Sequence, residues 1–367
     1  MAKGHRGFDL ILLFVVITLV GIGIVMVYST SAILAGDRFQ DLSYFLKRQV
    51  LFAGIGFILM ALMMFFHYPV LKKFAYPILI LSIFSLIALS IPGMGHRAGG
   101  AIRWLKIGDL SFQPSEFSKL GLVIFLAYFL TKKEEKIRSF KFGFLPTILL
   151  SGLVITLVLE EPDLGSALFL TAVVFLLLFV SGARVSYIVG AFILVASVVY
   201  YLMMNVEYLS KRWLSFIQHW GNPARAHFQV SQSYLSFGSG GLFGLGLGEG
   251  KQKLFFLPAP HTDFIFSIIG EELGLVGAMF LVLLFFILTL RGIQIGLSLG
   301  DRFGAYLALG ITLMISLQAV INMGVVLGLL PTKGLTLPFI SYGGTSLVTN
   351  LAGMGILLHL STHMERR

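Results

Sequence analysis

One acid, Asp263, stands where a carboxylate could do chemistry. The stretch Leu257-Pro-Ala-Pro-His-Thr-Asp263 leads directly into a long apolar run. Pro258 and Pro260 break any helix before Asp263, because proline lacks the amide donor and disfavours α geometry in the residue ahead of it. Two interpretations follow. Either Thr262 or Asp263 caps the next helix, or the carboxylate faces a cavity or a partner, as ionisable groups beside apolar spans usually do.

A second pair of charges lies in Phe112-Gln-Pro-Ser-Glu116-Phe-Ser-Lys119. Pro114 suits the first position of a helix. Glu116 and Lys119 then follow at a spacing of three and can pair on one helix face. Such a pair is far easier to place within a membrane than either charge alone. We favour a structural ion pair over a direct catalytic role.

Two further polar stretches have simpler interpretations. Glu160-Glu161-Pro-Asp163 packs three acids into a turn, and we expect a solvated hairpin. The glycine-rich segment 238–251 resembles a phosphate loop. However, Leu245 stands where that motif needs glycine, and Gln252 stands where it needs serine or threonine. We therefore reject a nucleotide loop and expect a flexible, close-packed glycine segment.

The composition defines the setting of these residues. The chain is 57% hydrophobic and 12% charged, and its mean hydropathy is +0.92. These values predict a polytopic membrane protein. The net charge of +10 is spread over short connections rather than gathered in a basic stripe with aromatics, so we predict no nucleic-acid partner. The chain has no cysteine, which excludes disulfides and thiolate chemistry.

Apolar runs long enough to cross a membrane recur along the chain. The predicted fold is all-α, with about ten transmembrane helices in a single domain over residues 1–367. The runs cover residues 10–28, 50–66, 74–91, 115–130, 144–159, 164–180, 187–204, 264–290, 303–330 and 341–360. The first run is longer than a signal-peptide core and is interpreted as an uncleaved helix.

Basic residues assign the sides of the membrane. An even number of spans returns the chain to its starting side, and lysines and arginines favour the cytoplasm. We predict that both termini and the basic run 132–141 are cytoplasmic. The long segment 205–263, between the seventh and eighth spans, is predicted to be extracytoplasmic. It is too long for a plain connection, and Leu209, Trp213 and Trp220 recur in it at the spacing of an interfacial amphipathic helix.

The same assignment brings the polar groups to the outer face. The segment 331–344 interrupts apolar sequence with two prolines and Lys333. Irregular backbone at that depth is tolerated where it is buried in protein or lines a wet cavity. The charged residues predicted near the outer face, around one cavity, are thus Asp263, Arg103, Glu116, Lys119, Lys251 and Lys333. One base candidate with several cations suits a substrate that carries hydroxyls and phosphates.

Together these motifs resemble the SEDS family (shape, elongation, division and sporulation). The resemblance is carried, in order along nearly the whole chain, by Arg103-Trp104-Leu, Phe112-Gln-Pro-Ser-Glu116, His261-Thr-Asp263-Phe-Ile-Phe, Gly270-Glu-Glu-Leu-Gly and Pro338-Phe-Ile-Ser-Tyr-Gly-Gly344. The segment 331–338 is more similar to the division branch than to the elongation branch. Two positions depart from the pattern: Ala259-Pro260 replaces the usual Glu-Ala, and Thr345 replaces a serine.

The resemblance implies a function and partners. It implies a peptidoglycan glycosyltransferase that polymerises lipid II, the undecaprenyl-pyrophosphate-linked disaccharide pentapeptide, outside the bacterial cytoplasmic membrane at the division septum. It also implies a class B penicillin-binding protein and other membrane proteins of the division machinery as partners. Asp263 matches the essential acid of the family, and Glu116 and Lys119 match its buried charge pair.

The implied chemistry assigns roles to the remaining candidates. Asp263 would act as the general base that takes a proton from the GlcNAc 4-hydroxyl, a role that contributes roughly 10²–10⁴-fold. Cations would stabilise the pyrophosphate that leaves. The candidates for binding substrate or pyrophosphate are Arg103, Lys251, Lys333, His261, Thr262 and Ser341. A divalent cation (Mg or Mn) could share this role, but the sequence offers no dedicated metal site.

Other functions remain open from the sequence. The same cavity could carry lipid II across the membrane, since transporters share broken helices and intramembrane charges. Against this, the polar groups gather at the outer side rather than at the midplane. An elongation-branch polymerase and a scaffold without catalysis are further alternatives, although a scaffold gives Asp263 no role.

Overall fold

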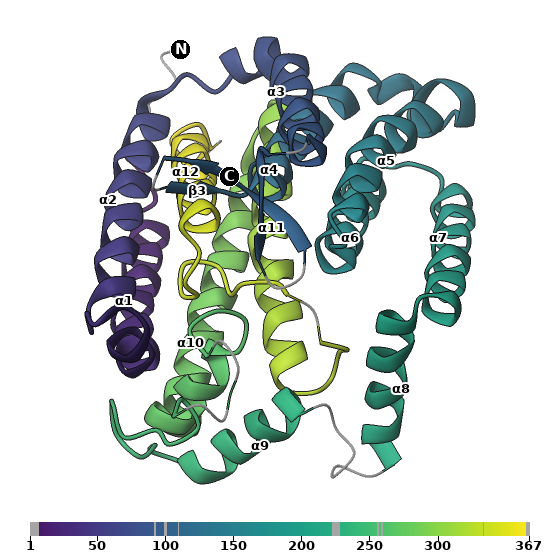
Figure 1. The fold of residues 1–367 in the computed structure, drawn as a ribbon. Coiled ribbons are helices and arrows are strands. Elements are labelled where there is room, and N and C mark those ends of the chain that lie inside the picture. The colour runs from purple at the N-terminus through teal and green to yellow at the C-terminus, as the bar shows by residue number, and fades with distance from the viewer. Residues whose placement is uncertain are drawn as a thin grey trace.

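The computed structural model describes residues 7–91, 93–98, 101–108, 110–221, 228–254, 257, 260–332 and 334–364. It is mainly helical (Figure 1). The α-helices are α1 (Leu10–Phe39), α2 (Tyr44–Phe65), α3 (Val70–Ile87), α4 (Pro114–Lys132), α5 (Leu145–Glu160), α6 (Leu164–Val180), α7 (Val185–Asn205), α8 (Glu207–Gly221), α9 (Phe228–Gly240), α10 (Ile265–Ser298), α11 (Arg302–Val326) and α12 (Gly344–Ser361).

Polar residues and proline set the starts of several helices. Asp9 accepts a hydrogen bond from the Leu12 amide at the start of α1. Asp163 caps α6, and Asp301 caps α11. A carboxylate satisfies amides that have no partner in the first turn. Pro114 opens α4 as predicted, because its missing amide donor is not needed there.

The predicted spans correspond to ten of these helices. Within the described residues, seven helical segments are long and apolar enough to cross a membrane, and α6 is a shorter apolar helix. The protein is therefore a multi-pass membrane protein. Several boundaries differ from the prediction: α1 has 30 residues and continues to Phe39, and α10 has 34 residues and continues to Ser298. Apolar runs predict that a helix is present, but they do not predict the polar residues at which it begins and ends.

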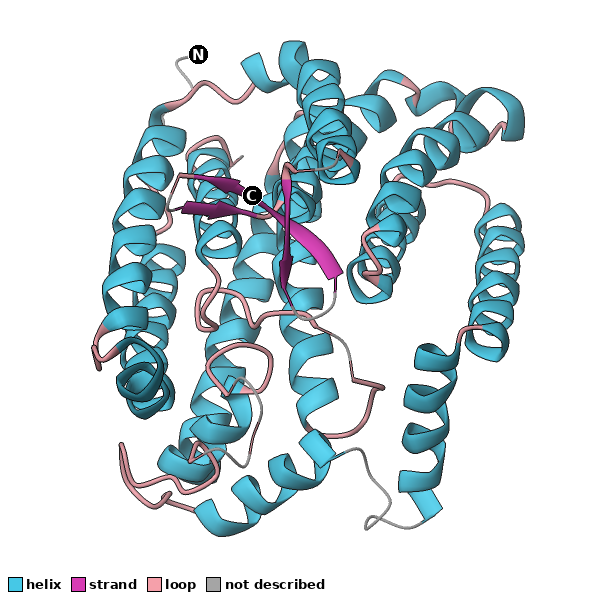
Figure 2. Ribbon diagram, in the orientation of Figure 1, coloured by secondary structure: helices cyan, strands magenta, loops and turns pink. Residues whose placement is uncertain are grey.

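A small sheet adds strands to the predicted all-α fold. The strands β1 (Gly95–Ala98), β2 (Ala101–Ile107) and β3 (Leu110–Phe112) form an antiparallel sheet in the order β1-β2-β3. The sheet lies against the helices (Figure 2). It occupies the connection between α3 and α4. β2 carries Arg103, so the sheet gives this residue a rigid support.

The core and the periphery differ in packing. Helices α4, α11 and α12 are buried along most of their length. By contrast α7, whose residues are all described, has no buried side chain. Figure 1 shows α7 and α8 forming a column that stands apart from the other helices. Both the column and the bundle contribute residues to one polar pocket.

Helix α10 is broken at Gly274, which the sequence analysis treated as part of one run. Gly274 has φ 68° and ψ −168°, a backbone conformation that favours glycine. The segment 241–251, called the glycine loop below, replaces the helical hydrogen bonds lost at the break. The amides of Leu275 and Val276 donate to the carbonyls of Gly241 and Leu242, and the amides of Leu245 and Gly246 donate to those of Glu271 and Glu272.

The two acids of the broken helix hold this loop with their side chains. Glu271 accepts hydrogen bonds from the backbone amides of Lys251, at 2.7 Å, and Gln252, at 3.2 Å. Glu272 forms a buried ion pair with Lys253 at 2.6 Å and accepts a bond from the Ser29 hydroxyl. Both carboxylates are therefore structural. Gly244 and Gly250 approach α10 closely, whereas most other residues of the glycine loop are exposed, so the predicted close packing holds for only part of the loop.

The long segment before Asp263 has structure of its own, as predicted. It contains α8, which covers the predicted amphipathic stretch, and α9. The Ser233 hydroxyl of α9 donates to the Val326 carbonyl at the end of α11. The chain then passes through the glycine loop to Asp263.

Candidate active site

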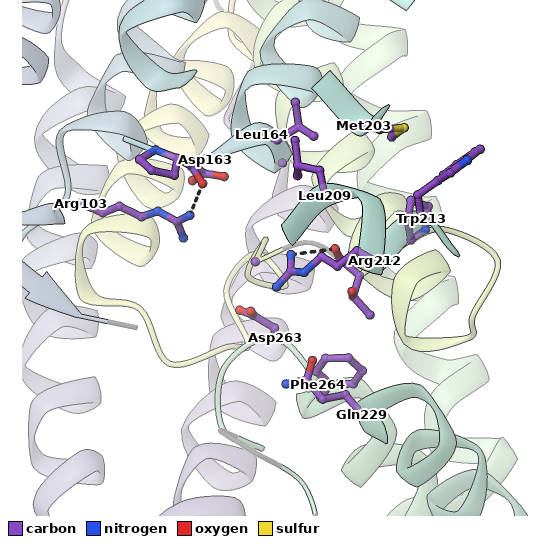
Figure 3. Close-up of a pocket in the computed structure, with 15 residues that line it drawn as sticks. Arg103, Asp163, Leu164, Met203, Leu209, Arg212, Trp213, Gln229, Asp263 and Phe264 are labelled. Atoms are coloured by element: carbon purple, nitrogen blue, oxygen red, sulfur yellow. Dashed lines mark hydrogen bonds between the residues drawn. The ribbon is translucent and has the colours of Figure 1, made fainter. Parts of the chain in front are cut away.

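A polar pocket surrounds Asp263. Its volume is about 210 Å³. It is lined by β2, the turn before α6 and the start of that helix, the α7–α8 column, the start of α9, Asp263 with Phe264, and Pro331 with Thr332 and Gly334. Figure 3 shows Arg103, Asp163, Arg212 and Asp263 converging on one space (Figure 3). Two acids and two guanidinium groups thus share this cavity, which we call the Asp263 pocket.

Asp263 does not cap a helix, contrary to one of the two expectations. Helix α10 has Phe264 at its N-cap position and no side-chain cap. The carboxylate is instead free to face the pocket. Burial, and to a lesser degree the charge of Asp163, raises the pKa of Asp263 to about 6, while Arg103 and Arg212 oppose this rise. A carboxyl with this pKa is mostly ionised at neutral pH and is a stronger base than an ordinary aspartate.

Backbone carbonyls hold the two arginines in place. Arg103 donates through Nε to the Glu161 carbonyl at 3.1 Å and through Nη2 to the Pro162 carbonyl. Arg212 of α8 donates to the Thr332 carbonyl at 3.1 Å. These bonds orient the guanidinium groups without neutralising them. A fixed positive charge of this kind suits a phosphate group, which arginine recognises through paired donors.

Two of the three acids before α6 are buried and only Glu160 is exposed, so the prediction of a solvated hairpin is wrong for Glu161 and Asp163. Glu161 and Asp163 are only 4% and 3% exposed. Asp163 accepts bonds from the amide and hydroxyl of Ser166 and also lines the Asp263 pocket. Burial, followed by the charge of Asp163, raises the pKa of Glu161 to about 8. In the sequence, a proline between acids that join two apolar helices is typical of an exposed turn, so the pattern did not indicate that Glu161 and Asp163 are buried.

Several hydrogen bonds join the Asp263 segment to the segment 334–342. Asn322 of α11 donates through Nδ2 to the Asp263 carbonyl at 2.9 Å and to the Leu335 carbonyl at 2.7 Å. The Ser341 hydroxyl donates to the Thr262 carbonyl at 2.6 Å, and the Tyr342 amide donates to the His261 carbonyl. Ser341 and Thr262 thus position the segments beside Asp263. Sequence reasoning did not identify Asn322, because a single neutral amide in an apolar helix gives little signal.

The predicted pair of Glu116 and Lys119 is confirmed as a buried ion pair. The Lys119 Nζ lies 2.7 Å from the Glu116 carboxylate, and the side chains are 1% and 7% exposed, respectively. Lys119 also donates to the Gln318 amide oxygen at 3.3 Å, and Gln318 donates to the Thr336 carbonyl at 2.9 Å. The pair does not line the Asp263 pocket. It supports, through Gln318, the segment that does.

The other predicted residues lie apart from the pocket or outside the described residues. His261 is buried against Phe45 and Tyr342, and burial lowers its pKa to about 4. Lys251 is exposed in the glycine loop and is absent from the pocket lining. Lys333 lies outside the described residues. Among the residues that the structure describes, no three His, Asp or Glu side chains form a group that could hold a metal ion.

A second cavity is apolar. It has a volume of about 560 Å³ and lies among α2, α3, α4 and α12. Phe52, Ile55, Phe117 and Ile356 are among its lining residues, and Phe112 and Thr345 bring it close to the ends of β3 and α12. A cavity of this kind favours a hydrocarbon chain.

Comparison with known proteins gives a consistent result. A family model described as "Cell cycle protein", which covers FtsW, RodA and SpoVE, matches residues 10–366. The chain is 46% identical to a protein of Geobacter metallireducens named "Probable peptidoglycan glycosyltransferase FtsW", over 99% of this chain and 97% of that protein.

Two solved structures share the fold. One, described as "Structural coordination of polymerization and crosslinking by a peptidoglycan synthase complex", has a chain with a TM-score of 0.79 and 31% identity, covering 96% of this chain and 97% of that chain. The rod shape determining protein RodA of Thermus thermophilus gives a TM-score of 0.71 at 30% identity, over 98% of both chains. The chain therefore belongs to the FtsW, RodA and SpoVE family, the SEDS family whose motifs its sequence carries.

Proposed function

We propose that this protein is a peptidoglycan glycosyltransferase that polymerises lipid II, with Asp263 as the general base. The observation that carries the proposal is the convergence of one basic carboxylate and two guanidinium groups on one pocket. Glycosyl transfer from a diphosphate needs both functions, because a proton must leave the acceptor and charge grows on the leaving group. The relatives named peptidoglycan glycosyltransferase support the same class of reaction.

The reaction assigns each group a task. The acceptor hydroxyl, the GlcNAc 4-hydroxyl, attacks the anomeric carbon of the donor, and its proton passes to the Asp263 carboxylate. The bond between the anomeric carbon and the diphosphate oxygen breaks, and the diphosphate leaves with the electron pair. Arg103 and Arg212 stabilise the negative charge as it develops. Their carbonyl partners hold them ready, so little reorganisation is needed during the reaction.

The apolar cavity gives the lipid portion of the substrate a place. An undecaprenyl chain is a long branched hydrocarbon, and a cavity lined by Phe, Ile and Leu binds such a chain by burying apolar surface. Binding energy from this remote part of the substrate can orient the sugar at Asp263. In this arrangement the undecaprenyl chain is held among α2, α3, α4 and α12 while the sugars react at the Asp263 pocket.

The setting of the reaction is also part of the proposal. The pocket opens on the extracytoplasmic side, and both termini are cytoplasmic, since the basic connections lie on the side of the termini. A class B penicillin-binding protein crosslinks the new strands, which the solved synthase complex supports. The protein acts at the septum with other membrane proteins of the division machinery. Depletion is expected to give filaments with unfinished septa, whereas round cells with normal septa would indicate the elongation branch.

The direct test is the wild-type protein with lipid II. Purified protein in detergent or nanodiscs is incubated with lipid II, alone and with a class B penicillin-binding protein, and glycan chains are separated on gels. A parallel assay in liposomes measures the movement of lipid II between leaflets. Chain formation is the expected result. If the protein moves lipid II between leaflets but forms no glycan chains, it is a transporter and not a glycosyltransferase.

A further inference from the structure

Gly334 lines the Asp263 pocket and has no side chain where one would lie between Asp263 and Arg103. A Cβ built on Gly334 would lie 3.5 Å from Oδ2 of Asp263 and 3.9 Å from Nη1 of Arg103. These are the two atoms that come within 4 Å of it. Gly334 is exposed toward the pocket that it lines. The space beside its Cα is thus bounded by the carboxylate on one side and the guanidinium on the other.

The backbone does not explain why this residue is glycine. The φ angle of Gly334 lies outside the left-handed region, unlike that of Gly274 or Gly328. The nearest neighbours of an added methyl group would be at ordinary contact distances and belong to side chains. An alanine could therefore occupy the position without strain in the fold. Its only structural effect would be to fill the space between Asp263 and Arg103.

The backbone segments that carry Asp263 and Gly334 are held at a fixed separation. Asn322 donates from one amide nitrogen to the carbonyls of both Asp263 and Leu335, the residue after Gly334. Asn322 is 2% exposed, so water does not compete for these bonds. Gln318 fixes Thr336 one turn away. The slot between Asp263 and Gly334 therefore cannot widen readily to admit substrate beside an added side chain.

The chemistry requires that this slot be open. The attacking hydroxyl must lie within hydrogen-bond distance of the Asp263 carboxylate, about 2.6–3.2 Å. The leaving diphosphate must lie beside the cation that stabilises it. The anomeric carbon joins the two and must therefore lie between Asp263 and Arg103, where Gly334 leaves room.

We propose that Gly334 is a specificity-determining residue, whose absent side chain forms the slot for the anomeric carbon and its diphosphate, and that Asn322 is a positioning residue that fixes the width of the slot. This inference rests on the proposed function. It adds that the slot is wide enough for the anomeric carbon and diphosphate of the substrate, but not for these groups and a side chain at position 334 together. The remote parts of lipid II bind elsewhere and are unaffected.

The test is a series of increasing side-chain size. Gly334→Ala and Gly334→Val are compared with Gly353→Ala, a control on α12 whose added methyl group would also meet side chains at ordinary distances, from 3.4 Å to 3.9 Å. We expect kcat for chain formation to fall about tenfold for Gly334→Ala and about a hundredfold for Gly334→Val, because a displacement of about 1 Å can reduce a rate a hundredfold. KM should stay within about twofold, and Gly353→Ala should match wild type.

Asn322→Ala gives an independent measurement. It should lower kcat at nearly unchanged KM, because the slot loses its fixed width while the lipid portion still binds. Thermal unfolding of each purified variant separates this result from a loss of fold, and Gly334→Ala keeps the test valid if Gly334→Val fails to fold. Wild-type kcat in Gly334→Ala, with Asp263→Asn inactive, would overturn the inference and leave the function intact. Wild-type protein that forms no chains would overturn both.

Discussion

At the scale of single residues, the site depends on where charges are buried and what touches them. Asp263 gains basicity because it is buried beside another acid. Backbone carbonyls accept hydrogen bonds from Arg103 and Arg212 and orient both guanidinium groups in the pocket. Glu271 and Glu272, equally prominent in the sequence, are used to hold the glycine loop. Residue type alone does not distinguish these uses.

The pKa of Asp263 predicts the pH dependence of the reaction. Because the pKa is raised to about 6, kcat should fall about tenfold per pH unit below pH 6 as the base becomes protonated. A solvated aspartate would keep its activity down to about pH 4. The measurement is the initial rate of chain formation between pH 4.5 and 8. A flat profile down to pH 5 would contradict the assigned pKa.

The same shift has a definite sign for stability. The folded state binds the Asp263 proton more tightly than the unfolded state, so the contribution of this group to stability decreases as the pH rises from about 4 to about 6. Acidification from pH 7 to pH 5 should therefore reduce activity without any unfolding caused by Asp263. Circular dichroism at each pH separates the two effects.

The buried pair of Glu116 and Lys119 predicts strong coupling. Removing one partner leaves an unpaired buried charge, which typically destabilises a protein by about 3–5 kcal/mol. Glu116→Ala and Lys119→Ala should each lower the unfolding temperature, and the double variant should lose less than the sum of the two. The exposed pair of Glu207 and Lys211 is the matched control, for which a cycle should show little coupling. Additive losses at the buried pair would contradict this account.

At the scale of elements, the sequence predicted helices well and their interruptions poorly. Long apolar runs specify helices, because backbone groups in lipid must be paired within the chain. The break at Gly274 and the sheet at residues 95–112 depend on partners distant in sequence, so neither was predictable from local pattern. Asp263 and Arg103 were identifiable because charge is rare in such a chain. Asp163 resembled a surface turn, and Asn322 and Gly334 carry no charge at all.

The broken helix α10 predicts that Gly274 cannot be replaced. A Cβ there would lie 2.3 Å from the Gly244 amide nitrogen, and its positive φ disfavours other residues, typically by about 1–3 kcal/mol. Gly274→Ala should therefore reduce the yield of folded protein and its unfolding temperature. Gly152→Ala is the control, since nothing lies within 4 Å of that position. Equal stability of the two variants would show that the glycine loop does not fix the break.

At the scale of the whole molecule, the helices bring distant parts of the chain to one pocket. β2 supplies Arg103, the turn before α6 supplies Asp163, α8 supplies Arg212, and the segment before α10 supplies Asp263. Three of these parts follow α3, α5 and α7, and the fourth precedes the span of α10. A topology in which alternate connections lie on the same side of a membrane therefore places all four on one side.

The predicted side is testable because the chain has no cysteine. Lys136→Cys, in the basic connection before α5, should react with a membrane-impermeant maleimide only after permeabilisation. Ser239→Cys, which is exposed at the end of α9, should react in intact cells. The two positions serve as controls for each other. The reverse labelling pattern would place the Asp263 pocket on the cytoplasmic side and exclude the proposed reaction there.

The most direct test of the central claim is Asp263→Asn. This substitution preserves the size of the side chain but removes the basic oxygen, and Asp263 makes no capping bond that it would break. Asp263→Asn and wild type are purified, checked for equal unfolding temperature, and assayed for glycan chains from lipid II with the penicillin-binding protein present. The account predicts that wild type forms chains and that the folded Asn variant forms essentially none. Full polymerisation by Asp263→Asn would contradict it.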